Sequence, residues 1–320
     1  MAREGDPGRS NQSQRRGGSP GRQDGFVSEE SPKPKKPQAQ PLSHSSAETL
    51  STCEQRYHYY KIQQAPQDPD YQKADSLSLG SAFHKVLEDS KHEKPASIRD
   101  ELIKCTQDPD IQLPESDILL AHAMVLKYLR LHKQMGLKVL AVEVDIETKE
   151  VKGYVDAIME DGDGKWWIVD MKTWKDLKPH AVVMLQKDPQ AMLYASHAAL
   201  IAEQLGLDLS KFGGCRWRVV TKSSAKLQSK ETEAEYIMRL VEKHLSAYDI
   251  PIPFQESDAS ERLEAHLVMH KRTTKLLKEA PRRNYKACYN YFSPCPYWSR
   301  CYGKTYSEMA TAWDAGVTSI

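Results

Sequence analysis

Three consecutive segments in the middle of the chain constrain its fold most strongly. Val139–Thr148 alternates polar and apolar residues in the manner of a half-buried strand, and Glu150–Met159 and Lys165–Lys172 read as two more strands. The tripeptide Gly-Asp-Gly at 162–164 supplies a tight turn between the last two. The pattern predicts a small antiparallel meander, whose second and third strands form a hairpin.

Helical patterns precede and follow this meander. Apolar residues at helical spacing run from Leu50 to Tyr60, with Ser43 as a candidate cap, and similar patterns recur along the chain. The further helices are expected at Leu79–Ser90, Ser116–Met135, Asp188–Leu205, Glu231–Tyr248 and Ala259–Lys278, and a fourth strand at Cys215–Thr221. We therefore expect an α/β fold in which a small mixed sheet is flanked by helices, with helical additions and a Cys-rich C-terminal segment.

The charge balance argues against a globally basic nucleic-acid binder. Lys and Arg number 45 and Asp and Glu 44, so a nucleic-acid substrate would need a local site rather than a general basic field. No apolar run approaches the ~18 residues that a membrane span needs, and the N-terminus lacks the apolar core of a secretory signal. The expectation is a cytoplasmic protein that is neither secreted nor membrane-bound.

The first 41 residues are predicted to form a disordered tail. They are rich in Pro and Gly and hold few apolar side chains, so they cannot bury enough surface to offset the entropy of ordering. An inert tail and a weak nucleic-acid tether are both compatible with this composition. One folded domain is expected over residues 42–305, followed by a C-terminal tail at 306–320.

Two carboxylates and a lysine lie on the predicted hairpin. Gly153-Tyr154-Val155-Asp156 is on its first strand, and Asp170-Met171-Lys172-Thr173 is at the end of its second. Asp170 and Lys172 share a strand face, and Asp156 can reach that face from across the hairpin. This set suits hydrolysis assisted by Mg²⁺ or Mn²⁺, in which a lysine helps to generate the attacking hydroxide. The alternative is an exposed ion pair of little consequence, but the buried-looking run at 166–169 directly before Asp170 favours a site.

These residues resemble the PD-(D/E)xK nuclease superfamily, in particular its RecB/Cas4/AddB-like branch, which includes phage exonucleases. Four segments match in order along the folded chain, although each one alone is weak. They are the opening helix from Leu42-Ser43-His44-Ser45-Ser46 to Cys53-Glu54-Gln55-Arg56-Tyr57, the helix Gly80-Ser81-Ala82-Phe83-His84, the acidic motif of the hairpin, and the helix Gln190-Ala191-Met192-Leu193-Tyr194. The resemblance implies a restriction-endonuclease-like core and a metal-dependent deoxyribonuclease.

The resemblance also implies a role for each matching residue. Asp156, Asp170, His84 and the backbone carbonyl of Met171 would bind the metal, and Lys172 would be the catalytic lysine. Gln190 and Tyr194 lie four apart, share a helix face, and would contact DNA phosphate or position the site; packing against the sheet is the alternative. Glu143, on the strand before the hairpin, is a weaker acidic candidate.

Six cysteines are present, and three of them cluster near the C-terminus. Without a secretory signal a disulfide framework is disfavoured, and three thiols amid Pro and aromatic residues suggest a metal or cluster site, with ordinary free cysteines as the alternative. The resemblance implies a [4Fe–4S] cluster, with Zn²⁺ as the alternative, on Cys53, Cys288, Cys295 and Cys301. The spacing within the C-terminal three departs from the commonest family pattern, so Cys105 or Cys215 could substitute; otherwise these two are interpreted as unligated thiols.

The expected partner is DNA, with single-stranded DNA or DNA ends favoured by family analogy. Arg216, Arg218 and Lys222, on or after the fourth strand, are the predicted DNA contacts, and a denser basic run at 271–286 is a second candidate. A recombination or repair protein is a candidate partner. The alternative function is a catalytically idle DNA-binding or assembly subunit that keeps a nuclease fold stapled by a cluster or by zinc.

Overall fold

The computed structural model describes residues 39–69, 71, 75–109, 111, 113–290 and 293–316, all within one compact unit, Gln38–Ile320. The predicted tail at 1–41 therefore lies almost entirely outside the described residues. The helices are α1 (His44–Thr52), α2 (Glu54–Tyr57), α3 (Asp75–Asp89), α4 (Ile98–Cys105), α5 (Glu115–Met135), α6 (Pro179–Gln186), α7 (Pro189–Ala195), α8 (Ala198–Leu205), α9 (Glu233–Arg239), α10 (Glu256–Leu276), α11 (Trp298–Tyr302) and α12 (Tyr306–Gly316).

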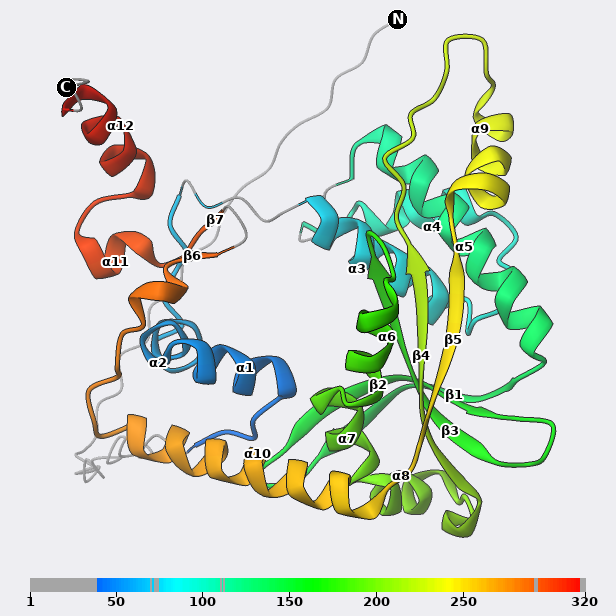
Figure 1. Ribbon diagram of the computed structural model, residues 1–320, viewed down its shortest axis with the longest axis horizontal. Coiled ribbons are helices and arrows are strands. Elements are labelled where there is room, and N and C mark those ends of the chain that lie inside the picture. Colours follow the sequence, from blue (N-terminus) through cyan, green and yellow to red (C-terminus); the bar gives the residue numbers. More distant parts are fainter. Residues whose placement is uncertain are drawn as a thin grey trace, which may run out of the picture. The chain divides into compact units, whose positions relative to one another are not determined.

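A five-stranded mixed sheet forms the centre of this unit (Figure 1). Its strands, in spatial and chain order, are β1 (Lys138–Glu147), β2 (Lys152–Glu160), β3 (Trp166–Trp174), β4 (Phe212–Thr221) and β5 (Ala247–Pro253). β1, β2 and β3 are antiparallel neighbours, β3 and β4 are parallel, and β5 is antiparallel to β4. The predicted meander and the predicted α/β class are both confirmed. A separate two-stranded ribbon joins β6 (Tyr289–Asn290) to β7 (Ser293–Pro294).

The alternation of side chains along β4 shows which helices cover which side of the sheet. Cys215, Trp217 and Val219 belong to a core that also contains side chains of α6, α7, α8 and α10. Val220 belongs to the opposite core, with α3, α4, α5 and α9. Because successive side chains of a strand point to opposite faces, the sheet is sandwiched between these two groups of helices. The buried-strand interpretation of Cys215 is confirmed, since it is 4% exposed.

Several predicted boundaries were wrong. The helix expected at Glu231–Tyr248 ends as a single π-helical turn at Leu240–His244, and the chain then forms strand β5. Buried and exposed side chains alternate along β5, and Ile250 and Ile252 are buried against β4. This alternation every second residue is typical of a strand and not of a helix. The helix expected at Asp188–Leu205 is divided into α7 and α8, and α4 and α6 were not predicted. None of the described helices is long and apolar enough to cross a bilayer.

Candidate active site

The acidic pair lies where two strands of the sheet separate. β2 and β3 pair from Glu160↔Trp166 to Ala157↔Val169, and the next positions in the same register are Asp156 and Asp170. Because the ladder stops there, the backbone N–H of Met171 is free to donate to Asp156 Oδ2 instead, at 2.6 Å. The break in pairing thus brings both carboxylates together and fixes one of them.

Helix α3 brings an imidazole to this pair. His84 Nδ1 lies 3.5 Å from Asp156 Oδ2. One turn earlier, a Cβ on Gly80 would come within 3.1 Å of the Thr173 hydroxyl, so glycine lets the helix approach β3 closely. The spacing of four residues between Gly80 and His84 therefore has a physical reason, since the glycine sets the distance at which the histidine reaches the strands.

Helix α7 holds the lysine and the second carboxylate in place. Asp188 caps the helix by accepting from the backbone N–H of Gln190, which orients that side chain toward β3. The Gln190 amide N–H₂ donates to Asp170 at 3.1 Å, and its carbonyl accepts from Lys172 Nζ at 2.9 Å. Lys172 Nζ also lies 2.8 Å from Asp170 Oδ2. Gln190 is thus the common partner of the lysine and the carboxylate.

Tyr194 supports Gln190 from inside the core. Its hydroxyl accepts from the Gln190 amide at 3.0 Å, and the residue is only 6% exposed. A Cβ on Gly153 would come within 2.8 Å of the Tyr194 ring, so the glycine at the start of the acidic motif makes room for this tyrosine. This burial favours positioning over DNA contact for Tyr194.

The two carboxylates have opposite pKa shifts. Burial and the neighbouring Asp156 charge raise the pKa of Asp170 to about 7. Burial acts in the same upward direction on Asp156, but the hydrogen bond and charge of His84, with the Met171 N–H and the Lys172 charge, together outweigh it and lower the pKa of Asp156. In turn, burial acts to lower the pKa of His84, and the interactions with Asp156 and Asp170 raise it. The raised pKa of Asp170 beside the lowered pKa of Asp156 indicates that burial and mutual repulsion disfavour the ionisation of both carboxylates together, a cost that a bound cation would reduce.

The donor set fits a divalent metal. Among the described residues no three His, Cys, Asp or Glu side chains already stand in metal-binding geometry. Instead, two of the candidate ligands, His84 and Asp156, pair with each other, and the third, Asp170, pairs with the ammonium of Lys172. Asp170 Oδ2 is buried and, despite the nearby ammonium, has no aligned hydrogen bond within the described structure. Two neighbouring buried carboxylates beside an imidazole are oxygen and nitrogen donors that suit Mg²⁺ or Mn²⁺.

Comparison with known proteins decides the family. A family model described as the PD-(D/E)XK nuclease superfamily matches residues 41–302. The chain belongs to the PD-(D/E)XK nuclease superfamily. The predicted restriction-endonuclease-like fold agrees with the mixed sheet and its flanking helices.

Two solved structures are similar to this chain at low sequence identity. A candidate exonuclease from Eubacterium rectale is 17% identical, over 77% of this chain and 85% of that one, with a TM-score of 0.45. The crystal structure of SSO0001 is 14% identical, over 80% of this chain and 97% of that one, with a TM-score of 0.27. A search of curated proteins found no match.

Asp170→Asn is expected to make the metal-free nuclease fold less sensitive to pH. With a pKa of about 7 when folded and about 4 when unfolded, Asp170 binds a proton more tightly in the folded state. Its contribution to stability is fully present below pH 4 and is lost as the pH rises through 7. In thermal melts with EDTA, Tm should fall between pH 6 and pH 8 by roughly 2–4 °C more in the wild type than in the variant. Equal falls would show that Asp170 does not titrate between pH 6 and pH 8, which would contradict a folded-state pKa of about 7.

Two of the three predicted DNA contacts are engaged within the fold. Arg218 is fully buried on the α5 side of β4, where Asp249 accepts from its Nε and Tyr128 from its Nη1. A guanidinium with no exposed surface does not reach a phosphate, so the expectation of a DNA contact is wrong for Arg218. Arg216 shares the same strand face, pairs with Asp249 and lies over the Trp167 ring at 4.3 Å. Lys222 is half-buried beyond β4, and burial lowers its pKa.

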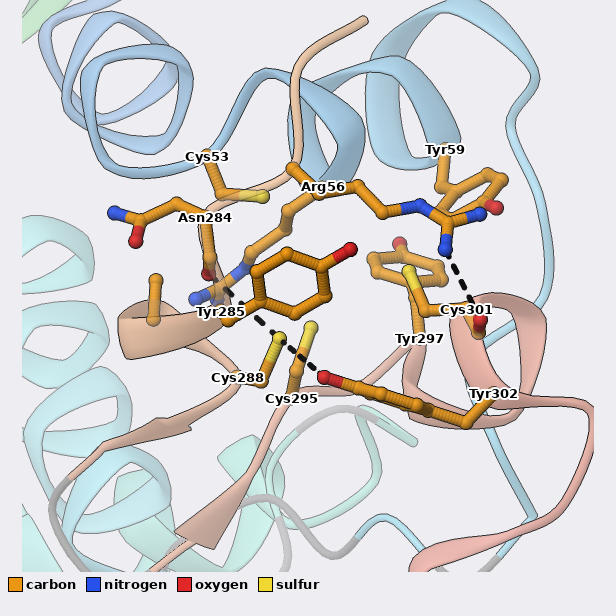
Figure 2. A pocket seen from close by; sticks show the side chains of 12 residues that line it. Cys53, Arg56, Tyr59, Asn284, Tyr285, Cys288, Cys295, Tyr297, Cys301 and Tyr302 are labelled. Atoms are coloured by element: carbon orange, nitrogen blue, oxygen red, sulfur yellow. Dashed lines mark hydrogen bonds between the residues drawn. The ribbon is translucent and has the colours of Figure 1, made fainter.

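Four of the six cysteines line a single pocket. Cys53 comes from the junction of α1 and α2, and Cys288, Cys295 and Cys301 come from the C-terminal segment. Figure 2 shows the four thiol side chains around the same space. Cys105 and Cys215 are buried elsewhere, in the two cores on either side of the sheet. The ligand set implied by the resemblance is thus gathered in one place.

Polar contacts independent of the thiols hold the two ends of the domain together. Glu54 accepts twice from Arg272, and the Asn284 amide donates to the Thr52 carbonyl at 2.8 Å. Farther along, the backbone N–H of Asp68 donates to the Pro296 carbonyl at 2.8 Å. These contacts join the opening helices to the C-terminal segment without involving a thiol group.

Sequence reasoning missed the side chains that surround the thiols. Tyr302 donates to Cys288 Sγ at 3.4 Å, and Arg56 and Arg283 also line the pocket. Arg283 was assigned only to a basic run, yet it donates to the Cys301 carbonyl at 3.3 Å. Its position five residues before Cys288 was the available signal, because positive charge stabilises clustered thiolates.

Proposed function

We propose that the protein is a Mg²⁺- or Mn²⁺-dependent deoxyribonuclease that hydrolyses phosphodiester bonds in single-stranded DNA or at DNA ends. The observation that carries this proposal is the buried Asp170 Oδ2 without an aligned hydrogen bond, set beside Asp156, His84 and Lys172. We propose recombination, repair or phage DNA metabolism as its setting, because the motifs resemble the RecB/Cas4/AddB-like branch.

The residues divide the chemistry between them. His84, Asp156, Asp170 and the Met171 carbonyl would hold the metal, which supplies charge stabilisation at the phosphate and lowers the pKa of water. The Lys172 ammonium, held by Gln190, lies where it can orient the attacking water and stabilise the charge that develops on the phosphate oxygens. Gln190 keeps the lysine and Asp170 in a fixed relation, and Tyr194 keeps Gln190 in place.

We further propose a [4Fe–4S] cluster on Cys53, Cys288, Cys295 and Cys301. Four thiols around one pocket match the ligand count of such a cluster. Arg56 and Arg283 at the same pocket offset the negative charge of four thiolates. Burial and the nearby thiols of Cys288 and Cys53 raise the pKa of Cys295, so without metal the set favours its protonated form. The cluster would tie the opening helices to the C-terminal segment.

A comparison of linear and circular DNA substrates distinguishes cleavage at DNA ends from internal cleavage. With Mg²⁺, linear single-stranded DNA is expected to be degraded to short products, blunt duplex DNA about tenfold or more slowly, and circular single-stranded DNA not at all. Equal cleavage of the circular and linear strands would contradict action at ends, whereas cleavage of RNA alone would contradict a DNA substrate. A denaturing gel of strands labelled at either end also gives the polarity.

A further inference from the structure

The aromatic ring of Trp217 lies against the lysine of the candidate site. Lys172 Nζ is 4.7 Å from the Trp217 ring centroid, within the range of a cation–π interaction. Trp217 is on β4, directly opposite Asp170 in the parallel register of β3 and β4. Since Asp170 and Lys172 share a strand face, the ring stands beside both of them.

The ring is held rigidly. Trp217 is 1% exposed, and its indole N–H donates to the Leu185 carbonyl at the end of α6 at 3.1 Å. Its face is therefore fixed by packing and by one hydrogen bond, while the Lys172 side chain is 29% exposed. A buried, anchored ring can orient a longer, partly exposed side chain, whereas the reverse is not expected.

The ring differs from the other two partners of Lys172 in one respect. Asp170 and Gln190 hold the ammonium through oxygen atoms, and Asp170 must also serve the metal in the proposed function. A π face attracts the ammonium without using a metal ligand. The ring would therefore still attract Lys172 if the oxygens of Asp170 held a cation.

We propose that Trp217 is a positioning residue, which holds the Lys172 ammonium beside the metal site through the face of its indole ring. The inference rests on the proposed function for its effect on rate, but the contact itself can be observed without any substrate. Nothing in the four matching sequence segments assigned a role to Trp217.

Two substitutions separate the ring face from the bulk of the side chain. Trp217→Phe keeps an aromatic face and loses the N–H, whereas Trp217→Leu keeps an apolar but smaller side chain and loses the face. We expect kcat on linear single-stranded DNA to fall about tenfold or more in Trp217→Leu and within about threefold in Trp217→Phe. Affinity for the same DNA, measured with Ca²⁺ in place of Mg²⁺, should stay within about twofold in both, because only the lysine is displaced.

Trp166 offers a matched control. It is 2% exposed in the same core, and its indole N–H also donates to a backbone carbonyl, that of Asp208. Trp166→Leu should lower Tm about as much as Trp217→Leu while kcat changes less than about threefold. The proposal fails if Trp166→Leu lowers kcat as much as Trp217→Leu does. It also fails if Trp217→Phe lowers kcat as much as Trp217→Leu does, because the effect is then one of packing.

A spectroscopic measurement keeps the proposal independent of activity. In protein labelled with ¹³C at the lysine ε-carbons, the signal of Lys172, assigned by its absence in Lys172→Arg, should be shifted upfield by the ring. The shift should persist in Trp217→Phe and vanish in Trp217→Leu. No shift in the wild type would overturn the proposal whatever the activity. An upfield signal that only Trp217→Leu removes, in a protein that cleaves no nucleic acid, would support the positioning role and contradict the proposed function instead.

Discussion

Lys172→Met is expected to lower the rate of DNA cleavage by about a thousandfold while leaving the fold intact. The methionine keeps the length and much of the volume of the lysine stem but removes the ammonium that lies between Asp170 and Gln190. The metal ligands are not altered, so Mn²⁺ affinity measured by calorimetry should be unchanged or higher, since one positive charge leaves the site. Cleavage is measured on end-labelled single-stranded DNA at saturating metal.

Lys175→Met is the control for this substitution. Lys175 is exposed, three residues farther along the chain, just past the end of β3. Its replacement removes the same charge from the same region and should change the rate by less than about threefold, since it lies outside the set of interacting side chains. If the two variants lose activity equally, Lys172 contributes only general charge, and the assignment of a catalytic lysine is wrong.

Cys288→Ser is expected to abolish the visible absorption of the anaerobically purified protein and to lower Tm by roughly 10 °C. The cluster would close a loop of more than 230 residues between Cys53 and Cys288, which is worth about 5 kcal/mol in the chain-entropy description of a cross-link. For a domain of this size each kcal/mol shifts Tm by about 2–4 °C. The polar contacts of Glu54 and Asn284 remain, so the variant should still fold.

Cys105→Ala serves as the control for the cysteine series. Cys105 is buried among α3, α4 and α5, away from the pocket. Its truncation should cost some stability through packing but leave the absorption near 400 nm unchanged. A wild-type protein that contains one zinc ion and no such absorption would contradict the cluster and leave the four-thiolate site itself intact.

Much of the fold and of the site follows from local patterns. The strand period of two, the Gly-Asp-Gly turn and the register of the hairpin together place Asp156 opposite Asp170. Helical spacing then explains why Gly80 precedes His84 by one turn, and Gln190 precedes Tyr194 by one turn. These relations depend on residues close in sequence, which is why the sequence alone could predict them.

The rest depends on pairings between distant segments. Strand β5 lies at the edge of the sheet and contains two prolines, so no strand was predicted there, and only its first two residues were included in the charged helix expected before it. Asp249 on β5 forms ion pairs with Arg216 and Arg218 within the fold. Because β5 was not predicted, both arginines were interpreted as exposed charges. The contact of Trp217 with Lys172 likewise requires the parallel register of β3 and β4, which no local pattern specifies.

Cleavage of end-labelled single-stranded DNA by the wild-type protein, after EDTA treatment and titration with Mg²⁺ or Mn²⁺, tests the central claim most directly. We predict no cleavage in EDTA, recovery with either metal, and no recovery in Asp170→Asn, although this variant keeps the fold. Cleavage that persists in EDTA, or that Asp170→Asn retains at the wild-type rate, would contradict a metal-dependent nuclease built on Asp156, Asp170 and His84. A wild-type protein that binds the DNA but cleaves nothing with either metal would favour an idle subunit with a nuclease fold.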